Sequence, residues 1–77
     1  MAVVIYTIPS CEWSNKAKKY LKDNNISFEE KDLTEDKLAR KEIVDISGQI
    51  GTPVIKIWQK VIIGFNSEEI KKAVTAQ

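Results

Sequence analysis

Cys11 is the only cysteine of this 77-residue chain, and the chain contains no histidine. A single cysteine cannot form a disulfide within the chain, and it cannot build a cysteine-rich zinc site. The absence of histidine removes the usual imidazole ligands, and it also excludes histidine-based acid–base catalysis and Cys-His hydrolysis. Few chemistries remain for Cys11, and thiol–disulfide exchange by its thiolate is the main one.

The position of Cys11 favours this chemistry over a purely structural role. A lone cysteine is ordinarily a small buried apolar residue. Cys11, however, follows an apolar run and the Pro9-Ser10 break, and it lies where a helix begins. Backbone N–H groups without a helical partner, together with the helix dipole, stabilise a thiolate there. We therefore expect a reactive Cys11, with Ser10 as the N-cap residue of the helix.

The first part of the chain predicts a strand, a helix and a second strand. Residues 2–7 have the uninterrupted apolar, β-branched pattern of a buried strand, and residues 26–33 alternate like a half-exposed one. The helix between them ends at 23–25 and implies a right-handed crossover with parallel pairing of the strands. Its expected buried stripe consists of Trp13, Ala17, Tyr20 and Leu21.

The second part predicts a helix, a hairpin and a last helix. Thr34 and Gly48 are the candidate N-cap and C-cap residues of the helix, and strands at 54–57 and 61–63 form an antiparallel hairpin. Asn66 is the candidate N-cap residue of the last helix, with Glu69 completing a capping-box pair. The expected buried residues of the two helices are Leu38, Ala39, Ile43 and Ile46, and then Ile70, Ala73 and Val74.

Composition limits the class of protein. The net charge is +1, from 12 Lys and Arg against 11 Asp and Glu, whereas a nucleic-acid-binding domain of this size is usually markedly basic. The apolar runs are too short to span a bilayer, and the N-terminus lacks a signal-peptide pattern. We therefore expect one domain over residues 1–77, a cytoplasmic monomer that binds neither nucleic acid nor membrane.

Three segments of the chain resemble the glutaredoxin family. Residues 4–21 are similar to the family's active-site strand, loop and helix, residues 47–55 to the stretch around its cis-proline, and residues 63–66 to the glycine turn before its last helix. The segments cover essentially the whole chain in the family order. The resemblance implies an α/β thioredoxin fold with the order β-α-β-α-β-β-α, in which helices flank a four-stranded mixed sheet.

The resemblance also implies the site and its partners. Glutathione would be the cosubstrate, and glutathionylated or disulfide-bonded proteins would be the substrates, with no metal. Cys11 would attack the disulfide, the backbone of Thr52 would pair with the cysteinyl unit, and the last helix's N-terminus would hold the γ-glutamyl carboxylate. The residues that would bind glutathione are Trp13, Gln49, Thr52, Pro53, Gly64, Phe65 and Asn66. The sequence does not set the isomer of the Thr52–Pro53 bond.

The active-site motif departs from the family's commonest form. In place of Cys-Pro-Tyr-Cys the chain reads Cys11-Glu12-Trp13-Ser14. A serine hydroxyl cannot resolve a mixed disulfide, but it can donate a hydrogen bond to the Cys11 thiolate, and we count Ser14 with Cys11 as catalytic. Glu12 places a negative charge beside the thiol, which opposes ionisation although it suits a helix N-terminus.

Further departures weaken the expectation of glutathione binding. Ile8 replaces a lysine, Gly51 replaces the threonine of Thr-Val-Pro, and Ile63 replaces the first glycine of the Gly-Gly turn. These changes are typical of glutaredoxin-like redoxins, some of which are recycled by thioredoxin reductase. The sequence leaves open whether Ser14 is native or replaces a resolving cysteine, and whether Cys11 stands for selenocysteine in the natural protein.

The sequence therefore predicts an oxidoreductase that reduces glutathione mixed disulfides by a monothiol mechanism through Cys11. Two alternatives within the family remain open. One is a glutathione-dependent protein that binds and transfers a [2Fe–2S] cluster, and the other is a redoxin recycled by thioredoxin reductase in which Ser14 replaces the resolving cysteine. A module in which Cys11 has no role in the function is a third alternative.

Overall fold

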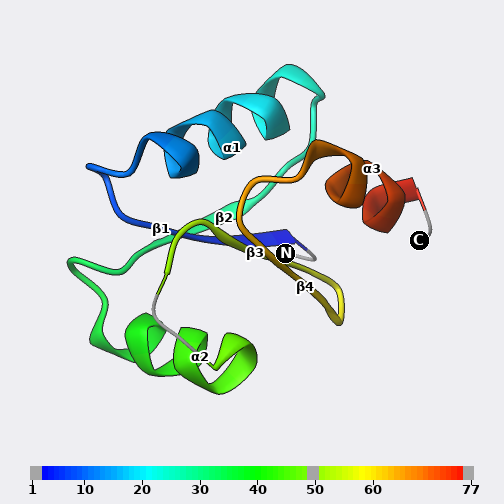
Figure 1. Cartoon of the computed structure of the whole chain (residues 1–77). Coiled ribbons are helices and arrows are strands. Elements are labelled where there is room, and N and C mark those ends of the chain that lie inside the picture. Colours follow the sequence, from blue (N-terminus) through cyan, green and yellow to red (C-terminus); the bar gives the residue numbers. More distant parts are fainter. Residues whose placement is uncertain (1–2, 49–50, 76–77) are drawn as a thin grey trace.

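The computed structural model describes residues 3–48 and 51–75. The elements follow the expected order β-α-β-α-β-β-α (Figure 1). Their bounds are Val3–Thr7 for β1, Glu12–Asp23 for α1, Glu29–Asp32 for β2, Lys37–Ser47 for α2, Val54–Ile57 for β3, Lys60–Ile63 for β4 and Ser67–Thr75 for α3.

The strands form one four-stranded mixed sheet in the order β2-β1-β3-β4. β1 and β2 are parallel, as the helical connection through α1 predicts. β1 and β3 are antiparallel. β3 and β4 form the predicted antiparallel hairpin. Helices α1 and α3 cover one face of the sheet and α2 covers the other (Figure 1).

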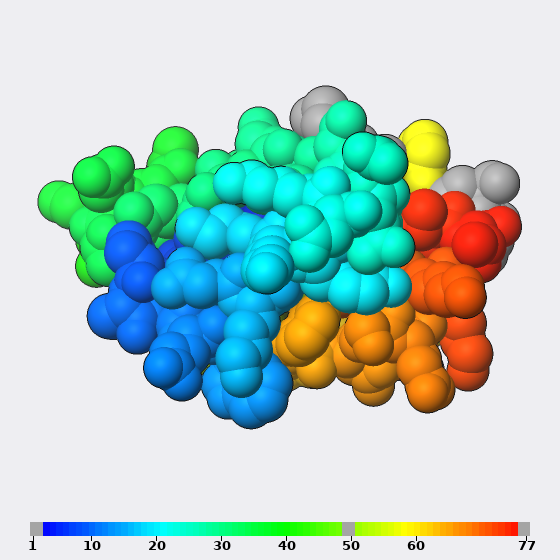
Figure 2. Space-filling model, turned by 90° about the horizontal axis from the view of Figure 1, so that it is seen from above, coloured from blue at the N-terminus to red at the C-terminus, as the bar shows by residue number. Residues whose placement is uncertain are grey.

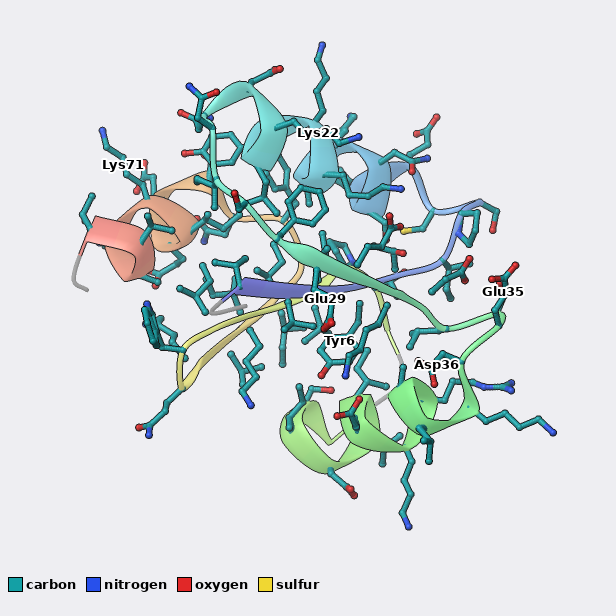
Figure 3. The ribbon with its side chains drawn as sticks, turned by 180° about the vertical axis from the view of Figure 1, so that it is seen from behind. Tyr6, Lys22, Glu29, Glu35, Asp36 and Lys71 are labelled. Carbon is teal, nitrogen blue, oxygen red and sulfur yellow. The ribbon has the colours of Figure 1, made fainter. Side chains whose placement is uncertain are left out.

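Each face of the sheet carries its own apolar core. On the α1 and α3 face, Ile5 and Ile55 pack with Leu21 and Ile70, which are all fully buried. On the α2 face, Tyr6 points from β1 toward α2, where it joins the cluster that contains Ile43 (Figure 3). Since successive strand residues face opposite sides, the uninterrupted apolar pattern of β1 supplies both cores.

Three of the predicted helix ends are confirmed. α1 ends at Asp23 with Asn24 as its C-cap residue, within the predicted 23–25. Gly48 ends α2 in the left-handed conformation, at φ 77°, and its N–H donates to the Val44 carbonyl at 2.8 Å. The Asn66 side chain accepts a hydrogen bond from the Glu69 N–H at 3.2 Å at the start of α3.

Two other predicted helix ends are wrong. The N-cap residue of α1 is Cys11 itself, one residue after Ser10. The N-cap residue of α2 is Asp36, whose carboxylate accepts from the Ala39 N–H at 3.0 Å. Thr34 lies two residues before this cap, in a turn where its N–H and hydroxyl both donate to the Asp32 carboxylate, at 2.8 and 2.6 Å.

Two of the predicted buried side chains are exposed, and one strand is shorter than predicted. Trp13 is 56% exposed and Leu38 is 75% exposed. Ala39 and Ile43, four residues apart, share the buried face of α2, and Leu38 is turned away from that face by its position next to Ala39. β2 covers only Glu29–Asp32 of the predicted 26–33. Within residues 3–48 and 51–75, no helix is long and apolar enough to cross a membrane.

Candidate active site

Cys11 lies between the end of β1 and the start of α1. Its N–H donates to the Ile8 carbonyl at 2.9 Å, and its carbonyl accepts from the Asn15 N–H at 3.2 Å. The Asn15 side chain also donates to the Pro9 carbonyl at 3.3 Å. The connecting turn and the first turn of α1 are thereby fixed to each other, which holds the half-buried Cys11 side chain at the helix N-terminus.

Residues 51–53, which we call the cis-proline loop, bring a distant part of the chain to Cys11. The Thr52–Pro53 peptide bond is cis, the isomer that the sequence left open. The Cys11 thiol donates a weak hydrogen bond to the Thr52 carbonyl, with 3.7 Å between sulfur and oxygen. The Gly64 N–H donates to the Pro53 carbonyl at 2.8 Å, so the glycine turn joins the same loop. The three segments singled out in the sequence therefore meet at one site.

A shallow groove of about 260 Å³ lies beside this junction, and its lining consists of Trp13, Thr52, Pro53, Gly64 and Phe65. The start of α1, in blue, lies beside the orange segment that leads into α3 on one face of the molecule (Figure 2).

The groove has an aromatic wall. The rings of Trp13 and Phe65 lie 6.4 Å apart between centroids, and Tyr20 meets Phe65 edge-on at 5.8 Å. The Lys16 ammonium lies 4.5 Å from the centroid of the Trp13 ring. Trp13 therefore packs against Phe65 and Lys16 at the groove instead of entering the core, which explains its exposure.

Ser14 is a buried polar residue next to the thiol. Its side chain is fully buried on the first turn of α1. The Ser14 hydroxyl is the only fully buried side-chain oxygen or nitrogen of the described residues that has no hydrogen-bond partner. A buried hydroxyl without a partner costs stability, and this one lies on the turn of α1 that directly follows Cys11.

The surroundings of Cys11 lower the pKa of its thiol from 9.0 to about 7. The neighbouring Ser14 hydroxyl is the largest cause, followed by the Thr52 side chain. The backbone N–H groups of Ser14 and Trp13 add to the effect, while burial opposes it. These four stabilising groups are all uncharged. The lowered pKa favours the thiolate form of Cys11 at neutral pH.

The structure brings together most of the residues that the sequence singled out. Cys11, Ser14 and the five groove residues lie at one site, and Asn66 follows directly after Phe65. Gln49 lies outside the described residues. The sequence prediction missed the hydrogen bond from the Cys11 thiol to the Thr52 carbonyl, because the two residues lie 41 positions apart. Among the described residues, no cluster of three or more Cys, Asp or Glu side chains could hold a metal ion.

Comparison with known proteins places this geometry in a family. The glutaredoxin family model matches residues 3–62, which is more than half of the chain. The chain belongs to the glutaredoxin family. It is 42% identical over 72 residues to an uncharacterized glutaredoxin-like 8.6 kDa protein of the rubredoxin operon in Clostridium pasteurianum, across 94% of this chain and 96% of that protein.

Solved structures agree with this family assignment. A variant of the thioredoxin-like protein BC3987 superposes with a TM-score of 0.91 at 28% identity, across 99% of this chain and 97% of that one. Methanoredoxin from Methanosarcina acetivorans superposes with a TM-score of 0.81 at 27% identity, across 92% and 81% of the two chains. The expected thioredoxin fold and the resemblance to glutaredoxins are both confirmed, and the chain has the fold of a thiol–disulfide oxidoreductase.

Proposed function

We propose that this glutaredoxin-family protein reduces glutathione mixed disulfides by a monothiol mechanism through Cys11. The observation that supports this most strongly is the Cys11 thiol itself. It faces the cis-proline loop at the groove, and its pKa is lowered to about 7. A thiolate of this kind is both abundant and nucleophilic at neutral pH.

In the first step, the Cys11 thiolate attacks the glutathione sulfur of a substrate mixed disulfide. A new disulfide forms between Cys11 and glutathione, the original disulfide breaks, and the substrate cysteine leaves with the electron pair and takes a proton from solvent. The Thr52 backbone pairs with the glutathione cysteinyl unit in this proposal. Backbone N–H groups of Phe65 and Asn66, at the start of α3, hold the γ-glutamyl carboxylate.

In the second step, the thiolate of another glutathione attacks the bound glutathione sulfur. Oxidised glutathione departs, and Cys11 regains the electron pair as a thiolate. An intramolecular disulfide step is impossible because Cys11 is the only cysteine of the chain and Ser14 occupies the position of the resolving residue. The Ser14 hydroxyl instead stabilises the released thiolate.

The aromatic wall gives the groove a surface for a small peptide. Trp13 and Phe65 offer apolar contact to the glutathione backbone, and the Lys16 ammonium beside Trp13 attracts a carboxylate. Gln49, which would contact the glycine carboxylate, keeps the role that its position in the family motif suggests.

The mass of the intact protein after incubation with oxidised glutathione tests the proposal. We expect the protein to gain one glutathione, which added reductant removes, and we expect the Cys11→Ser variant to gain none. Absence of the adduct in the unaltered protein, or its persistence in the variant, would refute the proposal. A coloured dimer after anaerobic iron–sulfur reconstitution with glutathione would instead support cluster binding.

A further inference from the structure

Tyr20 of α1 contacts the start of α3 at two residues. Its ring meets the Phe65 ring edge-on, with 5.8 Å between the centroids, and its hydroxyl donates to the Ser67 carbonyl at 3.4 Å. We propose that Tyr20 is a positioning residue, which holds the backbone of residues 65–66 where it can bind the γ-glutamyl carboxylate and so makes the protein selective for glutathione mixed disulfides. This inference rests on the proposed function and deepens it.

The two halves of the proposed glutathione site lie on separate elements. Cys11 lies at the N-terminus of α1, whereas the N–H groups of Phe65 and Asn66 directly precede α3. A ligand that reaches both halves needs them at a fixed separation, because a misplacement of about 1 Å can lower a reaction rate about 100-fold. The contacts that join α1 to the start of α3 therefore affect how well glutathione fits.

The segment before α3 is held at both of its ends. The Gly64 N–H donates to the Pro53 carbonyl at 2.8 Å, which attaches one end to the cis-proline loop. At the other end, the Tyr20 hydroxyl attaches Ser67, the first residue of α3, to α1. Phe65 lies between these two attachments and packs against the Tyr20 ring. Tyr20 therefore attaches both a ring and a backbone group of this segment to α1.

Tyr20 acts from outside the groove. Among the described residues, it lines a different hollow, of about 310 Å³, together with Asn24, Ile26 and Val74. The Tyr20 side chain is half-buried at the edge of the core on the α1 and α3 face. Because one side of the ring borders this hollow, close packing does not fix the ring on that side, and the contacts with Phe65 and Ser67 supply its position. Tyr20 thus influences glutathione through Phe65 and the segment around it.

Two variants of Tyr20 test this role. Tyr20→Phe removes the hydroxyl and keeps the ring, and Tyr20→Leu removes both while it keeps an apolar side chain on the helix. The matched control is Tyr6→Phe, which removes a tyrosine hydroxyl on the α2 face of the sheet (Figure 3). Circular dichroism checks that each variant is folded, and the pH dependence of alkylation checks that the pKa of Cys11 is unchanged.

The decisive measurement compares two substrates that differ in the carboxylate. One is a cysteine-containing peptide in a mixed disulfide with glutathione, and the other is the same peptide in a mixed disulfide with β-mercaptoethanol, which has no carboxylate. The loss of each substrate on mixing with the reduced protein gives a second-order rate constant. The ratio of the two rate constants is the selectivity for glutathione.

We expect both Tyr20 variants to react several-fold more slowly with the glutathione disulfide, and Tyr20→Leu to be the slower of the two. Both variants should react with the β-mercaptoethanol disulfide as fast as the unaltered protein does, because the thiol itself is unaffected. Tyr6→Phe should match the unaltered protein with both substrates. Equal losses with both substrates in the Tyr20 variants, or unchanged selectivity in Tyr20→Leu, would overturn the positioning role.

A failure of the proposed function gives a different result. In that case the unaltered protein itself shows no preference for the glutathione disulfide. Backbone order parameters of residues 64–67 from nuclear magnetic resonance then decide the positioning role without any ligand. Tyr20→Leu should lower them and Tyr6→Phe should not, and unchanged order parameters in Tyr20→Leu would overturn the inference.

Discussion

The pKa of Cys11 is lowered by uncharged groups. Its pKa falls to about 7 through the hydroxyls of Ser14 and Thr52 and through backbone N–H groups at the start of α1. Dissolved salt screens interactions between charges more than it affects uncharged groups next to a half-buried sulfur. The reactive thiolate of this protein should therefore depend on hydroxyl geometry and not on ionic strength.

The alkylation rate of Cys11 should follow this ionisation. Because the folded-state pKa is lowered, the thiolate is present above about pH 7, and the rate should fall about tenfold per pH unit below it. Ionisation of Cys11 also adds to the free energy of unfolding, because the folded state favours the thiolate. This contribution is complete above the pKa of the unfolded thiol, and it disappears as the pH falls through about 7. The alkylation rate with iodoacetamide is measured by mass spectrometry after reactions at a series of pH values, at low and at high salt. The pH at which the rate is half of its maximum gives the pKa of Cys11. A midpoint near 8.5, or one that moves strongly with salt, would disagree with this account.

At the scale of elements, α1 is attached to the sheet by a polar bridge as well as by its apolar stripe. The Thr7 hydroxyl of β1 donates to the Glu30 carboxylate of β2 at 2.7 Å, and the Lys18 ammonium of α1 lies 2.9 Å from the same oxygen. Burial would raise the pKa of Glu30, but the hydrogen bonds from Thr7 and Lys18 outweigh it and lower the pKa. This bridge helps to hold the helix whose N-terminus carries Cys11.

Replacing Thr7 with valine should weaken this bridge with little change in volume. We expect a loss of about 1 kcal/mol in the free energy of unfolding, because the Thr7 hydroxyl is buried and Glu30 would lose one of its donors. Urea denaturation measures the loss. An unchanged free energy of unfolding would mean that the bridge contributes nothing to the stability of the fold.

The start of α2 gives a second test at this scale. Asp36→Ala removes the N-cap carboxylate and should cost about 1 kcal/mol of unfolding free energy. Because α2 covers the face of the sheet opposite α1, the pKa of Cys11 should not change. Thr34→Ala is the control, since its exposed hydroxyl does not cap the helix. Equal losses in both variants would contradict the assignment of Asp36 as the cap.

The sequence predicted the elements better than their ends. The order of strands and helices follows from long apolar patterns, and three separate motifs identified the site. The helix starts were missed at Ser10 and Thr34 because several capping-type residues stand close together, and the sequence does not show which one meets the helix. The hydrogen bond from the Cys11 thiol to the Thr52 carbonyl was missed because it joins residues that are 41 positions apart in the sequence.

For the whole molecule, the sheet separates the candidate active site from the second core. The groove lies beside α1 and the turn into α3, whereas α2 packs on the opposite face around Tyr6 and Ile43 (Figure 3). A chain of 77 residues has a total stability of only about 4–12 kcal/mol, so both cores are needed to keep the site intact. Small changes in the α2 core should affect stability without affecting the thiol.

Ile43→Val tests this separation. The loss of one buried methyl group should lower the free energy of unfolding by about 0.5–1.5 kcal/mol, because Ile43 is fully buried. The pKa of Cys11 should stay at about 7. Lys41→Ala, at an exposed position of the same helix, is the control and should change stability by less than about 0.5 kcal/mol. A shifted Cys11 pKa in Ile43→Val would show that the two faces are coupled.

Turnover of a glutathionylated peptide tests the central claim most directly. The unaltered protein and the Cys11→Ser variant are compared with glutathione, glutathione reductase and NADPH, and in parallel with thioredoxin reductase and NADPH alone. The account predicts steady NADPH oxidation by the unaltered protein in the glutathione system, and only the uncatalysed rate with Cys11→Ser. Turnover only with thioredoxin reductase, or equal rates for the two proteins, would contradict a glutathione-dependent mechanism through Cys11.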